Sequence, residues 1–468
     1  MERLERMKKP DTRLPRRTFL KAAGAAGAAL AAPEIIPTTA LAAAGRKGAN
    51  DRILVGHIGM GGRARGLWRE LGSLRQAGET ESVAVCDVDE NRLKDAVTMV
   101  AGEASAGVRV DAYRDYRYIL ERKDIDAVVI GTPDHWHGVQ FVHAAECGKH
   151  IYCEKPACCT IEESKAMAAA AEKAKIASQI GSQGRSQPEA YLMHRYLANG
   201  VVGKVRHVEC FHYPSPVDTS VTPDSEPPPE LDWDLWLGPL PWRPYNARHH
   251  HGVFRWLLES GGGQIRDRGA HVMSCAKYWM NADQTGPVSI EATGTPPNQG
   301  LWDSAVTMKV TYTFKNPDWV LTWEQMPNDQ LPAAEERTEE EIRQFSKISR
   351  PGYGAIYHGE SGTCMHWGGD GGTWAERKVR NWQPPAGAVD VYKSPGHMED
   401  WFLVIRGQRE KCIMDIASAA RVANLCILGN VAYILGRKLN WDPVKQEIFG
   451  DDEAQRMMSR PQRHPYHL

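Results

Sequence analysis

The sequence predicts an α/β protein, with an N-terminal Rossmann domain built on a doubly wound parallel sheet and a C-terminal α+β domain built on a largely antiparallel open sheet. Between Arg52 and about Gln183, short β-branched runs alternate with helical patterns, which is typical of βαβ units. After Tyr213 the chain is Pro- and Trp-rich and then alternates apolar and polar residues, as half-buried antiparallel strands do. The 468 residues, 42% of them hydrophobic, suffice for two or three domains.

The elements of the first domain follow one another in strand and helix order. The expected strands are 53–58, 82–86, 127–130 and 150–153, and the expected helices are 90–100, 138–146 and 160–175. Thr160, with an acidic residue three positions on, predicts the capped start of the last of these helices. We therefore place the nucleotide-binding domain at residues 43–183.

The second domain, residues 184–468, is less regular. A Pro- and Trp-rich connection spans 214–244. The expected elements after it are a strand at 306–314 and helices at 397–406 and 416–435. The highly charged stretch 328–349 fits a helix or a surface segment equally well. No internal repeat is present.

The first residues, 1–42, differ in composition from the rest of the chain. Residues 16–21 read RRTFLK and lead into an Ala/Gly-rich run over 22–32, and small residues stand at Ala40 and Ala42. This arrangement resembles a cleavable twin-arginine export signal, which would make the export machinery a partner and the protein periplasmic or otherwise extracytoplasmic. A membrane anchor is disfavoured, because the apolar run is shorter than the roughly 20 residues of a span and is interrupted at 33–34.

The charge balance argues against nucleic-acid binding, and the cysteine spacing argues against a disulfide framework. Lys and Arg number 57 against 58 Asp and Glu, so no global charge draws the chain to nucleic acid. The ten cysteines include no CxxC pair, and the adjacent Cys158 and Cys159 are more typical of packed small residues. A disulfide framework is not expected.

A dinucleotide-binding motif follows the first expected strand. It reads Gly59-Met60-Gly61-Gly62-Arg63-Ala64, a GxGxxA form of the Rossmann fingerprint. The first glycine permits a tight turn, the second lets the pyrophosphate approach, and a small third residue allows close packing of helix on strand. Asp87 follows Ala64 by 23 residues at the end of the next strand, where an acid binds the adenosine ribose. These features predict NAD, with NADP left open by the nearby Arg92; the alternative is a surface turn.

Five further motifs occur in order along the chain. They are Gly131-Thr132-Pro133-Asp134-His135-Trp136-His137, Cys153-Glu154-Lys155-Pro156, the segment GGGQIRDRGAH at 261–271, WDLWLGP at 233–239 and LNWDP at 439–443. Together with the glycine motif they resemble the Gfo/Idh/MocA oxidoreductase family over nearly the whole mature chain. The resemblance implies a hydride-transferring enzyme that acts on a sugar or polyol.

The resemblance also implies which residues react. Lys155, Asp267 and His271 would form the catalytic and substrate-binding group, with Lys155 also beside the nicotinamide. Oxidation of a carbinol requires removal of the hydroxyl proton, so a base with a pKa near neutrality is wanted and His271 is the natural candidate. An ammonium at Lys155 would stabilise developing alkoxide, while Asp267 would bind a neighbouring hydroxyl or orient the site. The further residues expected around the cofactor are Thr132, Pro133, His135, His137 and Glu154.

Each assignment has an alternative. Asp267 and His271 are four residues apart, so they share one face if their segment is helical, but they could also be an ordinary solvated pair. The histidines of this region, including the run 249–251, show no recognised metal-ligand spacing, so no metal is expected. Trp236 and Arg243 belong to a Trp- and Arg-rich stretch suited to a sugar ring, although packing would explain the tryptophans as well.

Three functions remain open. The first is an oxidoreductase with a tightly bound NAD(H), because an exported enzyme lacks a nicotinamide pool with which to exchange. The second is a family-related NAD-dependent glycoside-cleaving enzyme, which would need one more acid or base, such as His135, His137 or a tyrosine. The third is a non-catalytic sugar- or nucleotide-binding protein, which has no need of the three reactive residues together. A homo-oligomer is implied by the family resemblance only.

Overall fold

The computed structural model describes residues 51–105, 107–333, 338–340, 352–368 and 372–468. The expected export signal and most of the charged stretch 328–349 lie outside these residues. From Arg52 to the C-terminus the described chain forms a single folded unit.

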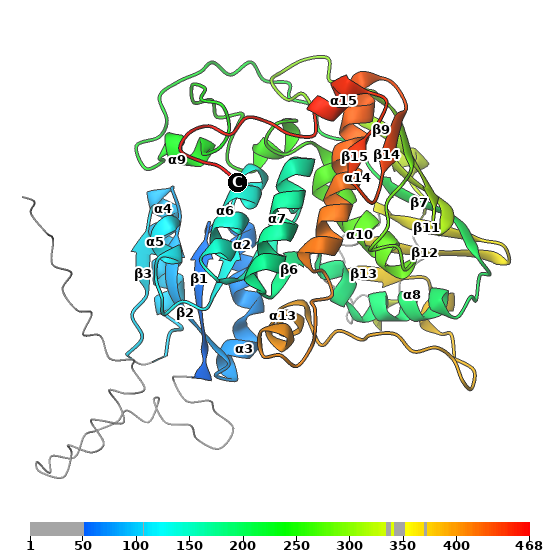
Figure 1. Ribbon diagram of the computed structural model, residues 1–468, viewed down its shortest axis with the longest axis horizontal. Helices are drawn as coiled ribbons and strands as arrows, with labels where there is room; N and C mark the ends of the chain where they lie inside the picture. Colours follow the sequence, from blue (N-terminus) through cyan, green and yellow to red (C-terminus); the bar gives the residue numbers. More distant parts are fainter. Residues whose placement is uncertain (1–50, 106, 334–337, 341–351, 369–371) are drawn as a thin grey trace, which may run out of the picture. The chain divides into compact units, whose positions relative to one another are not determined.

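The first sheet has six parallel strands in the order β3-β2-β1-β4-β5-β6 (Figure 1). They are β1 (Ile53–Ile58), β2 (Thr80–Cys86), β3 (Asp111–Tyr113), β4 (Ala127–Ile130), β5 (His150–Glu154) and β6 (Ser178–Gly181). Strands buried on both faces read as largely apolar runs, as β4 does throughout and β1 does except at His57. The predicted doubly wound Rossmann sheet is confirmed.

Helices cover both faces of this sheet. They are α2 (Gly62–Glu70), α3 (Gly72–Gln76), α4 (Glu90–Ala101), α5 (Arg117–Leu120), α6 (Asp134–Glu146) and α7 (Ile161–Ala174). Thr160 caps α7 as predicted, because its hydroxyl accepts the backbone N–H of Glu163 at 3.1 Å. The short helices α3 and α5 and the strand β3 were not predicted, because three to five residues carry too little periodicity to recognise.

A segment from the far end of the chain completes the first domain. Helix α13 (His397–Ile405) packs its Met398, Trp401 and Phe402 side chains against β1 and α2. This helix, which the predicted bounds assign to the second domain, thus shares a hydrophobic cluster with the first sheet. Its amphipathic pattern predicted a helix at the right place but not the sheet against which it packs.

The second sheet has nine strands in the order β13-β12-β11-β7-β10-β9-β8-β14-β15. They are β7 (Val205–His212), β8 (Ser289–Thr295), β9 (Thr307–Lys315), β10 (Asp318–Gln325), β11 (Tyr353–Gly359), β12 (Gly362–Gly368), β13 (Thr373–Ala375), β14 (Leu439–Asp442) and β15 (Glu447–Ile448). All neighbouring pairs are antiparallel except β7 with β10. The alternation in β9 buries every second side chain, so one face packs on helices, as predicted.

The remaining helical segments connect or cover this sheet. They are η3 (Gln183–Ser186), α8 (Pro188–Ala198), α9 (Trp233–Leu237), η4 (Gly252–Trp256), η5 (Ile265–Gly269), α10 (Ala270–Trp279), η6 (Asn328–Gln330), α12 (Arg377–Arg380), α14 (Ile416–Leu435) and α15 (Asp452–Arg456). Among the described residues, α14 alone is long and apolar enough to span a membrane, and 78% of its most apolar window is buried inside the fold. It serves here as a core helix.

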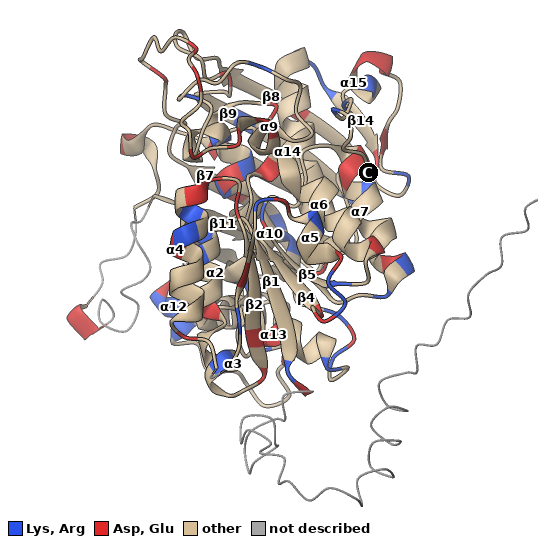
Figure 2. Cartoon of the chain, turned by 90° about the vertical axis from the view of Figure 1, so that its left-hand side faces the viewer, with Lys and Arg blue, Asp and Glu red and all other residues tan. Residues whose placement is uncertain are grey.

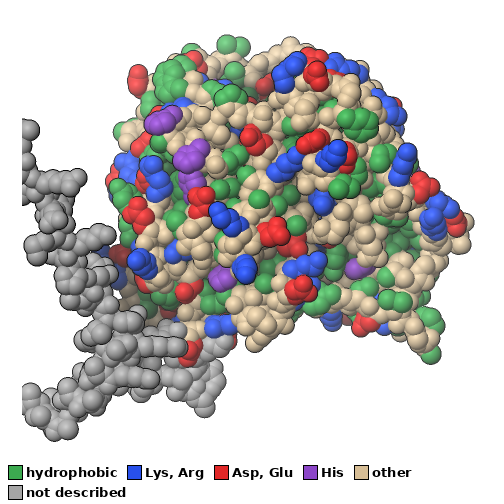
Figure 3. Space-filling view, viewed as in Figure 1, with side chains coloured by type: hydrophobic (Ala, Val, Ile, Leu, Met, Phe, Trp, Pro, Cys, Tyr) green, Lys and Arg blue, Asp and Glu red, His purple; other side chains and the backbone are tan. Residues whose placement is uncertain are grey.

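The surface of the described chain carries charges of both signs over both domains (Figure 2). On the face seen in Figure 3, hydrophobic side chains occur in small groups among polar ones. All ten cysteines are free thiols in the structure.

Candidate functional site

A cavity of about 1780 Å³ opens at the carboxyl ends of the first sheet's strands. Its first-domain wall comes from the ends of β1, β2, β4 and β5, and its second-domain wall from η4, η5, the start of α10 and the start of β13. Ligands of open α/β sheets bind at this edge. Because small-molecule pockets usually enclose about 300–1,000 Å³, the cavity has room for a dinucleotide and a second ligand together.

The glycine motif forms the tight turn between β1 and α2. Gly59 has φ +79°, and a Cβ there would lie 2.8 Å from the Thr132 side chain, so only glycine fits. A Cβ on Gly62 would meet nothing within 4 Å. The N-terminus of α2 therefore opens onto the cavity, where its N–H groups favour an anion such as a pyrophosphate.

Asp87 ends β2 beside this turn. Its carboxylate accepts the backbone N–H of Met60 at 2.7 Å and that of Asp89 at 3.0 Å. Burial raises the pKa of Asp87, and these two hydrogen bonds oppose the rise. Asp87 lines the cavity, and its carboxylate also fixes the glycine turn, which sequence spacing did not suggest; ribose binding by Asp87 stays a prediction.

Glu154 and Arg63 join β5 to the start of α2. The Arg63 Nε donates to Glu154 Oε1 at 2.8 Å, and the Gln183 amide donates to the same oxygen at 3.0 Å. Burial disfavours the carboxylate, but Arg63 and then Lys155 outweigh it and lower the pKa of Glu154. Both residues line the cavity beside the glycine turn, where they were expected.

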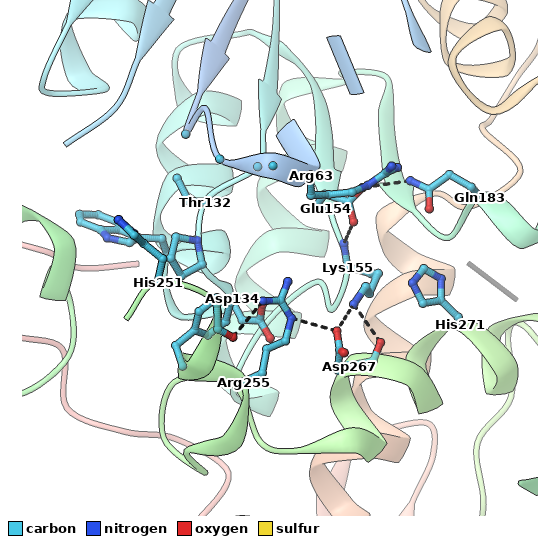
Figure 4. Close-up of a pocket in the computed structure, with 18 of the residues that line it drawn as sticks. Arg63, Thr132, Asp134, Glu154, Lys155, Gln183, His251, Arg255, Asp267 and His271 are labelled. Carbon is cyan, nitrogen blue, oxygen red and sulfur yellow. Dashed lines mark hydrogen bonds and ion pairs between the residues drawn. The ribbon is translucent and has the colours of Figure 1, made fainter. Parts of the chain in front are cut away.

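Lys155 reaches from the end of β5 to the second domain (Figure 4). Its Nζ donates to the Asp267 carboxylate at 2.6 Å and to the Asp267 carbonyl at 2.9 Å. Arg255 Nε lies 3.2 Å from the same carboxylate, and Arg268 Nε lies 3.4 Å from its other oxygen. Burial alone would raise the pKa of Asp267, but the three cations hold it well below its usual range. Asp267 is therefore a fixed anion that orients its neighbours.

His271 lies one turn beyond Asp267 and lines the same cavity. The π-helical turn η5 carries Asp267 and leads into α10, and such turns are frequent at functional sites. Burial, followed by the charges of Lys155 and Arg268, lowers the pKa of His271 well below its ordinary value. The expected pKa near neutrality is thus not what the structure gives, because the imidazole is buried and faces the Lys155 and Arg268 cations. The imidazole is therefore neutral, and negative charge that develops on a substrate oxygen beside it would strengthen it as a base.

Four predicted site residues lie away from the cavity wall. Ala64 packs on Gly131, where an added Cβ would lie 2.7 Å from the Ala64 side chain. His135 donates to the Trp236 carbonyl at 3.0 Å, so it holds α6 against α9.

The other two are His137 and Arg243. The ring nitrogens of His137 face the carbonyls of Pro156 and Thr132 at 2.8 and 3.0 Å. Arg243 pairs with Glu259 and His249. These contacts are structural, whereas Trp236, Thr132 and Pro133 do line the cavity.

Several charged residues of the cavity, among them Arg255 and Asp134, were not predicted as site residues. Arg255, on η4, binds Asp267, and Asp134, at the start of α6, is buried in the wall. Asp134 follows the end of β4 by a few residues, and an acid at such a position is a signal for a site residue. His135 and His137, which come just after it, were predicted as site residues instead. Among the described residues, no group of three or more His, Cys, Asp or Glu side chains is arranged to hold a metal ion.

Comparisons with known proteins agree with this architecture. A sequence model of the Gfo/Idh/MocA group described as an oxidoreductase family, NAD-binding Rossmann fold, matches residues 53–182, and its C-terminal alpha/beta domain model matches 213–334 and 387–468. A levoglucosan dehydrogenase of Pseudarthrobacter phenanthrenivorans is 31% identical over 191 residues, 39% of this chain and 42% of that protein. A glycosyl hydrolase family 109 protein of Shewanella putrefaciens is 29% identical over 208 residues, 42% of this chain and 45% of that protein. The match thus spans less than half the length of these relatives.

Solved structures extend the likeness to the whole fold. A levoglucosan dehydrogenase in complex with NADH has a TM-score of 0.57 at 19% identity and covers 83% of this chain and 99% of its own. The WlbA dehydrogenase from Bordetella pertussis, in complex with NADH and UDP-GlcNAcA, has a TM-score of 0.58 at 16% identity and covers 84% and 99%. At such identities the likeness establishes the fold.

Proposed function

This chain belongs to the Gfo/Idh/MocA family of oxidoreductases and carries its NAD-binding Rossmann domain, and from that premise we propose that it transfers hydride between a sugar or polyol hydroxyl and a bound nicotinamide cofactor. The single observation that carries the proposal is the Lys155–Asp267 pair, held at 2.6 Å beside the neutral His271 in a cavity that the glycine turn also lines. An ammonium, a fixed carboxylate and a neutral base are the groups that carbinol oxidation requires.

The residues divide the work as follows. When bound, the nicotinamide accepts or returns the hydride, which is chemistry the protein lacks. Lys155 donates a hydrogen bond to the reacting oxygen and stabilises negative charge on it as the hydroxyl proton leaves. The neutral His271 takes that proton, and Asp267 holds the Lys155 ammonium in place.

The cofactor is proposed to stay bound between turnovers. Segment 230–256 of the second domain supports this proposal, because it is hydrogen-bonded to the loop that follows Asp87. Asp232 N–H donates to the Val88 carbonyl at 3.0 Å, and His251 Nε2 lies 3.1 Å from the Asp89 carboxylate. These contacts, together with the expected export, favour a resident NAD(H) reoxidised in place by a second substrate.

A second candidate is redox-neutral cleavage of a glycoside through transient oxidation of its sugar. It is favoured by the relatives named glycosyl hydrolase family 109 proteins and by the buried Asp134 carboxyl in the cavity wall. Export through residues 1–42 and assembly as a homo-oligomer remain proposals from sequence and family.

The proposal is tested with the purified mature chain. Absorbance at 340 nm is followed while free sugars, polyols and aryl glycosides are added one at a time, and aglycone release is measured in parallel. A rise with a free sugar that a carbonyl acceptor reverses supports the oxidoreductase. A chain that binds no nicotinamide nucleotide contradicts the proposal.

A further inference from the structure

The chain returns to the first domain after α15. Residues 457–468, here called the C-terminal strap, run without helix or strand from α15 past α7 to α6 and α9 (Figure 1). Met458 and Tyr466 are only 5% and 6% exposed, and the Met458 carbonyl accepts the Glu162 N–H at 3.0 Å. Segments that open easily have few buried contacts, so these contacts indicate that the strap is docked on the fold.

Arg460 fastens the strap to α7. Its guanidinium donates to the fully buried Glu163 carboxylate at 3.0 Å and to the Glu259 carbonyl at 2.6 Å. The other oxygen of Glu163 accepts the Cys159 N–H at 2.6 Å. Removal of one partner of a buried ion pair leaves an uncompensated charge, so this contact is a permanent anchor of the strap.

Arg463 binds the strap to α9. Its Nε donates to the Gly238 carbonyl at 2.8 Å, and its two terminal nitrogens donate to the Asp234 carbonyl at 2.7 Å and to the Asp234 carboxylate. The backbone N–H of Arg463 donates to the Pro239 carbonyl at 3.0 Å. Because hydrogen bonds from a charged donor are the stronger ones, a single side chain fixes the end of this short helix.

Tyr466 and His467 cover the outside of the wall formed by α6. The Tyr466 ring lies edge-on to Trp136, with ring centroids 4.9 Å apart. The His467 carbonyl accepts a hydrogen bond from His143 Nε2 at 3.1 Å, so His143 Nδ1 accepts from the Tyr116 hydroxyl at 2.7 Å. Trp136 and Tyr116 line the cavity, so the strap supports the cavity wall from behind.

α9 is in turn joined to the loop that follows Asp87. The Asp232 N–H, at the start of α9, donates to the Val88 carbonyl at 3.0 Å, and Leu231 pairs with Asp89 in an antiparallel bridge. Val88 lines the cavity beside Asp87. A continuous series of contacts thus leads from the strap through α9 to the expected nucleotide-binding loop.

We propose that the C-terminal strap holds the nucleotide end of the cavity closed, with Arg463 as the positioning residue, so that the nicotinamide cofactor leaves only after α9 separates from the strap. The inference rests on the resident cofactor of the proposed function and adds the segment that controls its release. Neither Arg463 nor Tyr466 is among the described residues that line the cavity, so hydride transfer itself does not depend on them.

The test compares Arg463→Gln with the wild type and with Arg437→Gln. Arg437, just after α14, is a matched control because it also pairs with nearby carboxylates, those of Asp451 and Glu453. These partners belong to the second domain, so the control removes a similar set of contacts without touching α9. Arg463→Lys, which keeps the charge, is measured as the conservative variant.

Cofactor release is measured first. Cofactor-loaded protein is diluted into a nucleotide scavenger, and Arg463→Gln should release its cofactor about tenfold faster, because the loss of charge-assisted hydrogen bonds acts on the dissociation rate. Arg463→Lys should fall between this variant and the wild type. Reduction of the bound cofactor in a single turnover should keep its wild-type rate in all of them, a separation that a general loss of structure would not produce.

Amide hydrogen exchange supplies a readout that needs neither cofactor nor substrate. In nucleotide-free Arg463→Gln, peptides covering 230–240 and 88–93 should exchange faster than in the wild type, because both segments depend on the position of α9. Peptides of β9, which the strap does not contact, should exchange at the wild-type rate. Arg437→Gln should leave all three unchanged.

Three results would overturn the inference. They are wild-type release in Arg463→Gln, equally fast release in Arg437→Gln, and an increase in exchange that is as large in β9 as in 230–240. A bound cofactor that no sugar reduces contradicts the proposed function alone, since release is measured without substrate. A chain that binds no nicotinamide nucleotide overturns both, and the exchange result then shows separately whether the strap fastens α9.

Discussion

The Lys155 ammonium is ion-paired with the Asp267 carboxylate before any substrate binds. It shares the Asp267 carboxylate with Arg255 and Arg268, so the anion meets three cations. Three cations surround one anion, so this cluster carries a net positive charge beside the neutral His271. Such a field favours an alkoxide over an alcohol at the reacting oxygen, which is the direction of catalysis.

Replacement of Lys155 by alanine should therefore slow cofactor reduction by about 10²–10³-fold, because it removes the donor to the developing alkoxide. NAD binding should be nearly unchanged, since the glycine turn and Asp87 remain. Stopped-flow absorbance at 340 nm measures the first effect and fluorescence titration the second. Reduction at the wild-type rate with every active sugar would refute the assignment and favour the non-catalytic binder.

The Asp87 carboxylate is expected to contribute to nucleotide affinity. Asp87→Ala should weaken NAD binding about 10–100-fold, because it removes the ribose acceptor and frees the Met60 amide that orders the glycine turn. Titrations with NAD and NADP measure it, and discrimination between the two should shrink. Unchanged affinity for both nucleotides would show that Asp87 does not serve the cofactor.

At the scale of elements, the cofactor loop and the second domain are joined by a short stretch of pairing. Leu231 pairs with Asp89 in an antiparallel bridge, and the Glu90 N–H donates to the Glu230 carbonyl at 2.9 Å. The segment is anchored at its other side by His135 and by Trp136, whose ring nitrogens donate to the Trp236 carbonyl. It therefore acts as part of the cofactor-binding wall although it belongs to the second domain.

His251→Ala should let the cofactor dissociate about tenfold faster, because the variant removes the His251–Asp89 contact at 3.1 Å. His358→Ala is the matched control, since His358 makes a similar contact with Glu209 at 3.2 Å on the second sheet. Release is followed by dilution of the loaded protein into a nucleotide scavenger. If His358→Ala released the cofactor as fast as His251→Ala, segment 230–256 would have no specific role in retaining the cofactor.

The elements differ in how far sequence could predict them. β1, β4 and α14 have the predicted bounds, because their largely apolar sequences mark where a buried element begins and ends. The docking of α13 on the first sheet was missed, since periodicity identifies a buried face but not its partner. Asp134 was missed because His135 and His137, which follow it in the same motif, were predicted as site residues instead.

At the scale of the whole molecule, burial keeps many histidines uncharged. Desolvation lowers the pKa of His57, His135 and His366 to about 3, with a smaller effect of Arg75 at His57, while hydrogen bonds partly oppose it at the other two. In the unfolded chain these groups titrate near 6.5. Below that pH the unfolded state binds protons that the folded state does not, so stability falls as pH falls.

We expect the free energy of unfolding to drop by roughly 1.4 kcal/mol per pH unit for each such histidine between about pH 6.5 and their folded pKa values. The raised pKa of Asp134 and of Asp87 opposes this trend in part, because these carboxyls take up protons in the folded state first. Urea unfolding at pH 7.5 and 5.5 measures the difference. A midpoint that is equal or higher at pH 5.5 would contradict the account.

The central claim is hydride transfer at Lys155, and the most direct test follows the transfer of deuterium from substrate carbon to the cofactor. The cofactor-loaded chain is mixed with sugars, polyols and glycosides deuterated on carbon, quenched in acid, and the released nicotinamide cofactor is weighed by mass spectrometry. The account predicts that the cofactor gains one deuterium with at least one substrate in the wild type and none in Lys155→Ala within the same time. A cofactor that gains no deuterium from any of them, or gains it equally in both proteins, would contradict it.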